Sequence, residues 1–311
     1  MKRDVLAKLY NMQYILINAL ESPIIAIFLA YIIKYWNVDI KNQYGYVLSE
    51  NDNLPVYIFM TVICSIFVGL TVSAEEIIAD KRILKREAFL NLSRSSYLMS
   101  KVAILMVISA IQAFLFIILG NTILEIKGMY FEYWLVAFST WCFANLLGLN
   151  ISDSFKTAVT IYILIPFLVI PQIILSGIIV KFDKLNPTIS NPKDIPIYGE
   201  IMTSRWAYEA LAVKQFKDNE YEKLFYKWEK IMSQSDFIKN YWIKTLTNKL
   251  NACNRDIADS QKHEKVQADL NVLRNELRRE LKKNKRFEYN YFDKLTIKIL
   301  IMKFMKLHMS Y

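Results

Sequence analysis

The sequence is poor in the residues from which many catalytic and metal sites are built. Its 311 residues include only seven glycines, three cysteines and two histidines. No phosphate-binding P-loop, zinc-protease or serine-hydrolase motif occurs in it. Cys64, Cys142 and Cys253 form no disulfide framework, and His263 and His308 lie in separate charged stretches without further metal ligands. We therefore expect no catalytic centre, no metal site and no ATP hydrolysis by this chain alone.

What the sequence does contain is a series of long apolar blocks. Hydrophobic residues make up 54% of the chain, and they are concentrated in blocks rather than spread through it. A block of about twenty apolar residues is long enough to cross a bilayer as a helix. The sequence therefore predicts an all-α integral membrane protein with five clear transmembrane helices, at residues 12–35, 56–73, 102–120, 133–149 and 157–180.

The chain carries a formal net charge of +10. In a soluble protein that excess would suggest nucleic acid. In a chain with this many apolar blocks, anionic lipid and membrane topology explain it more simply. We expect membrane lipid as a partner and no nucleic acid.

A charged stretch, Ala74 to Lys101, separates the second and third apolar blocks. Its basic and acidic residues alternate, and apolar residues recur at helical spacing, which predicts an amphipathic helix. Charges at mid-bilayer cost about 3 kcal/mol or more each, so the stretch must lie on the membrane surface. Its six Lys and Arg residues favour the cytoplasmic side, together with the amino terminus. The alternative is a solvated loop that only sets topology.

Two apolar blocks contain costly residues. Glu21 lies within the first block, and a carboxylate in a span is by default a functional hypothesis; the alternative is a boundary position where it pairs with a nearby Lys or Arg. The last block carries Pro166, Pro171 and Gln172, followed by Ser176 and Gly177. Neighbouring helices must repair the backbone there, and small residues permit close helix contact. The alternative is an ordinary kinked span.

Two motifs in this order resemble those of a known family. The charged stretch reads Asp80-Lys81-Arg82, then Lys85-Arg86-Glu87, then SRSSYLMSK from Ser93 to Lys101, and the last block reads PQIILSG from Pro171. This pattern is similar to the membrane domain of type-2 ATP-binding-cassette (ABC) exporters of the G-subfamily kind. The resemblance covers roughly residues 3–216.

The resemblance implies that residues 74–101 are the coupling helix, which contacts the nucleotide-binding domain. It implies a permease subunit in the plasma (inner) membrane, working as a homo- or heterodimer with separate ABC ATPase subunits. Those partners would bind ATP and Mg, and this chain would hold no cofactor. The residues implied in coupling are Lys81, Arg82, Lys85, Arg86 and Glu87. The residues implied at the pathway or a helix contact are Glu21, Pro171, Gln172 and Gly177.

The remaining chain fits this pattern less well. We expect residues 1–180 to form the transmembrane domain and residues 181–290 an extracytoplasmic loop and charged helical region. Residues 291–311 would be a weak or truncated sixth span, because Lys298, Lys303 and Lys306 interrupt it. Two other functions remain open: a membrane-anchored mechanical or scaffold protein working through its extracytoplasmic region, and a membrane enzyme. An ATPase that copurifies with the chain would favour the transporter.

Overall fold

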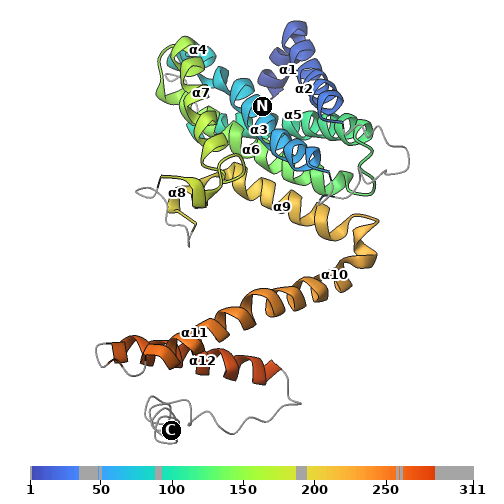
Figure 1. Cartoon of the computed structure of the whole chain (residues 1–311). Coiled ribbons are helices and arrows are strands. Elements are labelled where there is room, and N and C mark those ends of the chain that lie inside the picture. Colours follow the sequence, from blue (N-terminus) through green and yellow to red (C-terminus); the bar gives the residue numbers. More distant parts are fainter. Residues whose placement is uncertain are drawn as a thin grey trace, which may run out of the picture. The chain divides into compact units, whose positions relative to one another are not determined.

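The computed structural model describes residues 2–34, 48, 51–87, 93–186, 195–256, 259 and 262–283 (Figure 1). Within these residues the regular elements are all helical, as the sequence predicted. The chain divides into two compact units, Met1–Leu224 and Phe225–Tyr311. The sixth span expected at residues 291–311 lies outside the described residues.

Four helices of the first unit are long and apolar enough to cross a membrane. They are α2 (Met12–Ile33), α3 (Asn53–Ala74), α5 (Arg94–Ile123) and α6 (Tyr130–Ser154). They correspond to the first four apolar blocks. A shorter apolar helix, α7 (Ala158–Ile174), occupies most of the fifth block. Three further helices precede or follow them: α1 (Lys2–Tyr10), α8 (Ile197–Ile201) and α9 (Thr203–Asp218).

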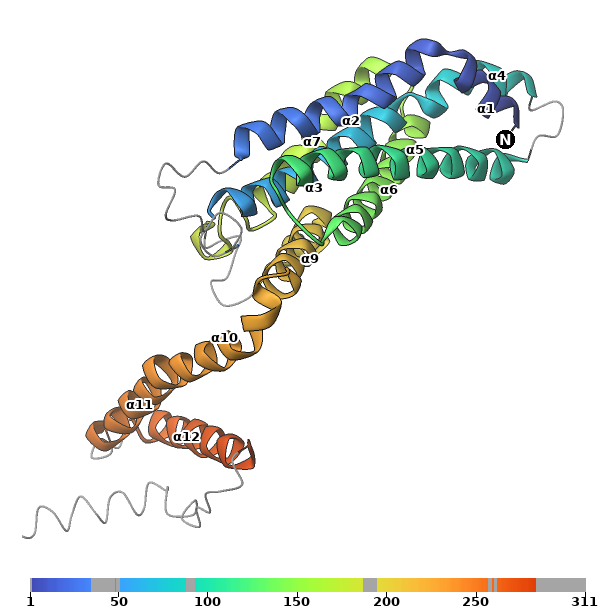
Figure 2. The same ribbon diagram turned by 90° about the vertical axis from the view of Figure 1, so that its right-hand side faces the viewer.

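Helix α3 is the centre of this bundle. In its apolar part 67% of the residues are buried, against 17% in α2. It packs against α2, α6, α7 and α9, and α2 also packs against α5 (Figure 2). The apolar side chains that α2 leaves exposed are therefore available to lipid or to another chain.

Small residues let α3 and α6 approach closely. A Cβ atom added at Gly69 of α3 would lie 2.6 Å from the Cβ of Ala144 in α6 and 3.0 Å from the Trp141 carbonyl oxygen. One added at Gly148 of α6 would lie 1.9 Å from Ser73 Oγ. Such contacts are how membrane helices associate where no hydrophobic effect favours their packing.

Polar side chains inside the bundle find partners on neighbouring helices. Ser22 Oγ of α2 donates to the Gln112 carbonyl oxygen of α5 at 2.6 Å, and Gln112 Nε2 donates to the Asn18 carbonyl oxygen at 3.0 Å. Asn145 Nδ2 of α6 donates to Ser109 Oγ of α5 at 2.5 Å. Because hydrocarbon offers no hydrogen bonds, these contacts fix which faces of the three helices meet.

The end of α7 turns sharply. Gly177 has a φ of +78°, and a Cβ there would lie 2.3 Å from the ring of Phe182, in the short 3-10 turn η2 (Phe182–Lys184). Gln172 accepts two hydrogen bonds from Ser204 of α9: its carbonyl oxygen from Oγ at 2.6 Å and its Oε1 from the amide at 3.0 Å. The helix therefore stops where glycine is needed and is tied to α9.

Helix α9 belongs to the first unit. Leu211 and Gln215 are fully buried on it, and the helix packs on α3 and α6. Arg205 forms ion pairs with Glu209 at 3.5 Å and with Glu200 at 3.0 Å. The region expected as one block at 181–290 is thus shared between both units.

The second unit contains α10 (Glu222–Phe237) from Phe225 onward, a π-helical turn η3 (Ile238–Trp242), α11 (Ile243–Asp256) and α12 (His263–Lys283). Helices α11 and α12 pack together as a hairpin around a small core of Cys253, Val266, Leu270 and Leu273. A charged helical region was predicted here from the sequence; its side of the membrane stays a prediction.

Candidate functional site

The charged stretch at residues 74–101 forms two helices. Helix α4 (Glu76–Glu87) follows α3 after a turn at Glu75, and α5 starts at Arg94. Glu76 in the first turn of α4 and Lys85 and Arg86 in its last turn suit the helix dipole. Helices α1 and α4 lie at one end of the first unit, and α8 and α9 lie at the other (Figures 1 and 2).

A cluster of four charges, two of them buried and two half-buried, holds α4 in place. Lys101 Nζ of α5 lies 3.1 Å from Glu76 Oε2 and 2.8 Å from Asp80 Oδ2, both on α4. Lys8 Nζ of α1 binds the other oxygen of Glu76. The side chains of Lys101 and Glu76 are only 4% and 7% exposed. The two carboxylates and two ammonium groups balance, so the cluster carries no net charge.

Two tyrosines complete this cluster. Tyr97 of α5 donates to Asp80 Oδ2 at 2.9 Å, and Tyr14 of α2 donates to Glu76 Oε1 at 3.2 Å. Each ring also lies near an ammonium group, with Lys101 Nζ 5.7 Å from the Tyr97 centroid and Lys8 Nζ 4.9 Å from the Tyr14 centroid. Buried ions are tolerated only where their remaining hydrogen-bonding capacity is met, and the tyrosines contribute to that.

Helices α4 and α6 cap each other. At the start of α4, the backbone amides of Ile77 and Ile78 both donate to Ser152 Oγ, each at 3.1 Å. One turn later, Lys81 Nζ donates to the carbonyl oxygens of Asp153 at 2.9 Å and Phe155 at 2.5 Å, at the end of α6. The unpaired amides at the start of one helix and carbonyls at the end of the other are thus satisfied across the contact.

The residues predicted to contact an ATPase fall into two groups. Lys81 is half-buried and is engaged with α6. Arg82, Lys85 and Arg86 are exposed and make no ion pair with a described residue. The side chain of Glu87 lies outside the described part of the chain. Their role in coupling stays a prediction.

Sequence reasoning missed the residues that anchor α4. Lys8 and Ser152 lie far from the charged stretch, and no local pattern marks them. A signal did exist for the others: Glu76 and Asp80 are four residues apart, as are Tyr97 and Lys101. Residues four apart lie on one face of a helix, so each pair shares a face. The acidic face of α4 can therefore meet the face of α5 that carries the tyrosine and the lysine.

The predicted pathway residues are not gathered at one place. Glu21 of α2 is half-buried and makes no hydrogen bond or ion pair with any described residue. It interacts electrostatically with Tyr162, in the first half of α7, as does Glu75. Pro171, Gln172 and Gly177 lie at the other end of α7, where Gln172 is bound to α9. A role for either group in the pathway stays a prediction.

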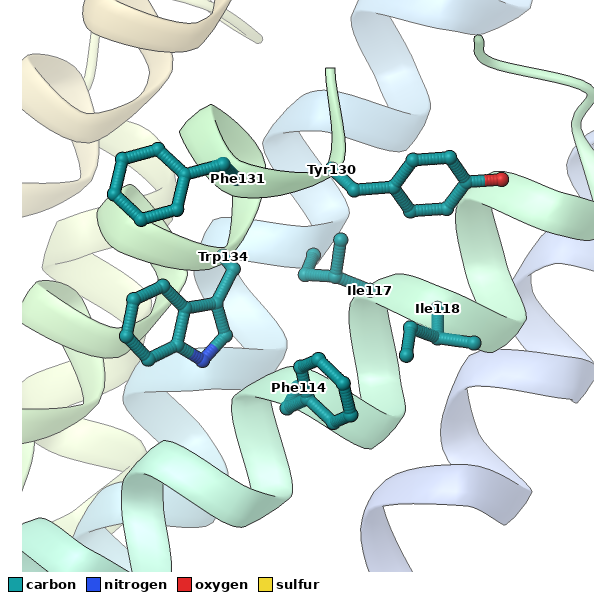
Figure 3. A pocket seen from close by; sticks show the side chains of 6 residues that line it. All are labelled: Phe114, Ile117, Ile118, Tyr130, Phe131 and Trp134. Atoms are coloured by element: carbon teal, nitrogen blue, oxygen red, sulfur yellow. The ribbon is translucent and has the colours of Figure 1, made fainter. Parts of the chain in front are cut away.

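An apolar pocket lies between the end of α5 and the start of α6 (Figure 3). Its volume is about 350 Å³. It is lined by Phe114, Ile117, Ile118, Tyr130, Phe131 and Trp134. With no charged group in its wall, it suits apolar material such as an acyl chain.

No group of three or more His, Cys, Asp and Glu residues that suits a metal ion occurs among the described residues. Cys64, Cys142 and Cys253 are free thiols. The polar groups described above connect helices to one another.

Comparison with known proteins agrees with this architecture. The model of the family "ABC-2 type transporter" matches residues 1–216, which cover the helices α1 to α7 and nearly all of α9. No curated protein and no solved structure matches the chain. The chain thus belongs to the ABC-2 type transporter family, as a multi-pass membrane permease component of an ABC transporter.

Proposed function

We propose that the chain is the permease subunit of an ATP-driven exporter of the G-subfamily kind. Two copies, identical or paired with a related chain, form the translocation pathway, and separate ABC ATPase subunits bind ATP and Mg. The observation that supports this most is the anchoring of α4, whose Arg82, Lys85 and Arg86 face outward while its other side is held by charges and caps.

In this proposal, α4 receives the movement of the ATPase. Closure of the two ATPases on ATP pushes against the exposed cations of α4. Because Lys101 binds Glu76 and Asp80, and Ser152 caps the helix start, α4 moves together with α5 and α6. The spans then rock, and the cavity between two copies opens toward the opposite side of the membrane.

The proposed orientation places α4 and the amino terminus in the cytoplasm of a cell whose plasma membrane holds the transporter. The six Lys and Arg residues between positions 74 and 101 support this, because short basic loops stay on the cytoplasmic side. The opposite end of the unit, with α8 and α9, would face outward.

The test is a triple variant, R82A/K85A/R86A. We expect it to be inserted and folded like the wild type but to lose copurification of the ABC ATPase subunit and the ATPase stimulation in proteoliposomes. A matched control removes three exposed lysines from the other end of the unit, K181A/K184A/K217A. It should retain both properties.

Two results would overturn the proposal. One is the absence of any copurifying ABC ATPase with the wild-type chain, which would favour the scaffold function instead. The other is equal ATPase stimulation by the triple variant and its control. Cysteine crosslinking between two copies at Ser176 tests the proposed dimer separately, and export is tested by the direction of transport in inside-out vesicles.

A further inference from the structure

Helix α10 leaves an apolar face uncovered. Leu224, Trp228, Ile231 and Met232 are spaced i, i+4, i+7 and i+8, so they share one face of the helix. Their exposed fractions are 74%, 65%, 48% and 64%. Charged and other polar residues occupy much of the rest of the helix, together with the exposed side chains of Phe225 and Phe237. Large apolar side chains gathered in this way indicate a surface that another apolar phase covers.

The start of α10 is fixed to the membrane unit. Asn219 Oδ1 accepts the backbone amides of Tyr221 and Glu222 at 2.9 and 2.7 Å, which caps the helix. Asn219 Nδ2 donates to the Gln215 carbonyl oxygen, and Gln215 Oε1 accepts a bond from Tyr133 OH of α6 at 3.0 Å. The first turn of α10 is thus held beside the beginning of α6.

The beginning of α6 marks a membrane boundary. Only a short connection, from Leu124 to Met129, joins α5 to α6, so both spans leave the bilayer there. Tyr130, Phe131 and Trp134 line the apolar pocket at this level (Figure 3). Aromatic residues of this kind are typical of the interface between hydrocarbon and headgroups.

We propose that α10 is an interfacial helix, whose face of Leu224, Trp228, Ile231 and Met232 inserts into the phospholipid bilayer. Only three residues separate α9 from α10, and so short a tether gives the face a high effective concentration toward the bilayer that holds the first unit. Helices that lie in the interface between water and lipid typically carry Trp and Leu on one side and Lys on the others. This role is independent of ATP coupling.

A second copy of the chain fits the face less well. Specific interfaces bury roughly 800 Å² per partner with matched shapes, and four side chains cover only part of that. A bilayer requires no matched shape. Lys227 lies next to the face, with Nζ 5.7 Å from the Trp228 ring centroid, so its charge can reach the headgroups while its methylene groups stay with the ring.

The exposed charges of α10 nearly balance. Lys223, Lys227 and Lys230 oppose Glu229 and Asp236. Binding to lipid therefore depends on the apolar face and only slightly on anionic headgroups. We expect it in phosphatidylcholine bilayers and expect it to persist at high salt.

The experiment compares two faces of α10 in the full chain. In a C64A/C142A/C253A background, a cysteine replaces either Met232, on the apolar face, or Lys230, on the opposite face. Each carries an environment-sensitive fluorophore, and the protein is placed in phosphatidylcholine nanodiscs whose lipids bear a nitroxide on the acyl chain. Monodisperse elution of both variants confirms that the chain is folded.

We expect the nitroxide lipids to quench the label at position 232 several-fold more than the label at 230, at low and high salt alike. Aqueous iodide should quench the label at position 230 more than the label at position 232. Equal lipid quenching at both positions overturns the proposal. Shielding of position 232 from both quenchers, with short label-to-label distances between two copies, also overturns it and assigns the face to a second copy.

Discussion

Lys101 Nζ and Glu76 Oε2 lie 3.1 Å apart, and the two side chains are among the most buried charges that the structure describes. They belong to α4 and α5, which follow one another along the chain. Removing one charge of such a pair leaves the other buried without compensation, which costs far more than an exposed pair contributes. This relationship gives the most direct test of how α4 is held.

Replacing Lys101 by methionine should strongly destabilise the membrane unit. Glu76 would keep Lys8, but Asp80 would keep only Tyr97 as a partner among the described residues. Breaking a buried ion pair costs about 3–5 kcal/mol. Thermal unfolding in detergent should show the loss as a much lower midpoint.

The double variant E76M/K101M supplies the control for this prediction. It leaves Lys8 and Asp80, whose charges balance. Its loss of stability should therefore be smaller than the sum of the losses in the two single variants. The exposed Lys156→Met change should have little effect. Additive losses in the cycle would contradict a coupled cluster.

Ser152→Ala tests the mutual capping of α4 and α6. It removes the acceptor of two backbone amides, at Ile77 and Ile78, in a place that water does not reach. Leaving buried groups unpaired costs about 1–3 kcal/mol. Ser154→Ala is the matched control, since Ser154 is exposed and bonds only the Asn150 carbonyl oxygen of its own helix. Hydrogen exchange should show faster opening of the α4 start in the first variant alone.

Gly69→Ala should destabilise the contact between α3 and α6. Helix propensity alone would predict a gain of about 1 kcal/mol from alanine. The added Cβ would, however, lie 2.6 Å from that of Ala144, and overpacking costs about 1–3 kcal/mol. The double variant G69A/A144G should recover much of the loss in thermal unfolding. A gain in stability from G69A alone would show that the two helices can separate freely.

The sequence was sufficient to predict the fold class and most of the spans. The apolar blocks match α2, α3, α5 and α6 because a bilayer demands long apolar helices whatever their neighbours are. The fifth block is a shorter helix than its 24 apolar-rich positions suggested: the backbone turns at Gly177, where the Phe182 ring leaves no room for a side chain. Such a turn depends on a contact from outside the block.

The site was predicted less completely. Charge alternation indicated an amphipathic helix within residues 74–101, and the structure has helix α4 there, at Glu76–Glu87. It did not indicate which charges are buried, because burial of Glu76 depends on Lys8 and Lys101, and the engagement of Lys81 depends on the end of α6. The spacing of residues along the sequence shows which of them share a helix face, but it does not show which residues of other helices contact that face.

The reactivity of Cys253 measures how readily the hairpin of α11 and α12 opens. Its thiol is buried between α11 and α12, and burial raises its pKa above the usual value, so less thiolate forms at neutral pH. In a C64A/C142A background, maleimide should label it far more slowly than it labels an N251C/C253A variant. Because the pKa is raised, its labelling should accelerate only at higher pH than that of the exposed cysteine.

Denaturant should bring the two labelling rates together. Similar rates under native conditions would show that the hairpin opens readily. The hairpin core is small, so its opening is expected at lower denaturant than the loss of the membrane unit.

The mutual capping of α4 and α6 also constrains the order of biosynthesis. Helix α4 leaves the ribosome well before Lys101 and Ser152, the residues that neutralise and cap it. Until α5 and α6 have been inserted, Glu76 and Asp80 lack Lys101 and the first amides of α4 lack their acceptor. Helix α4 is therefore completed only when the fourth span is in place, and a chain arrested earlier displays an unfinished helix to the quality-control machinery of the cell.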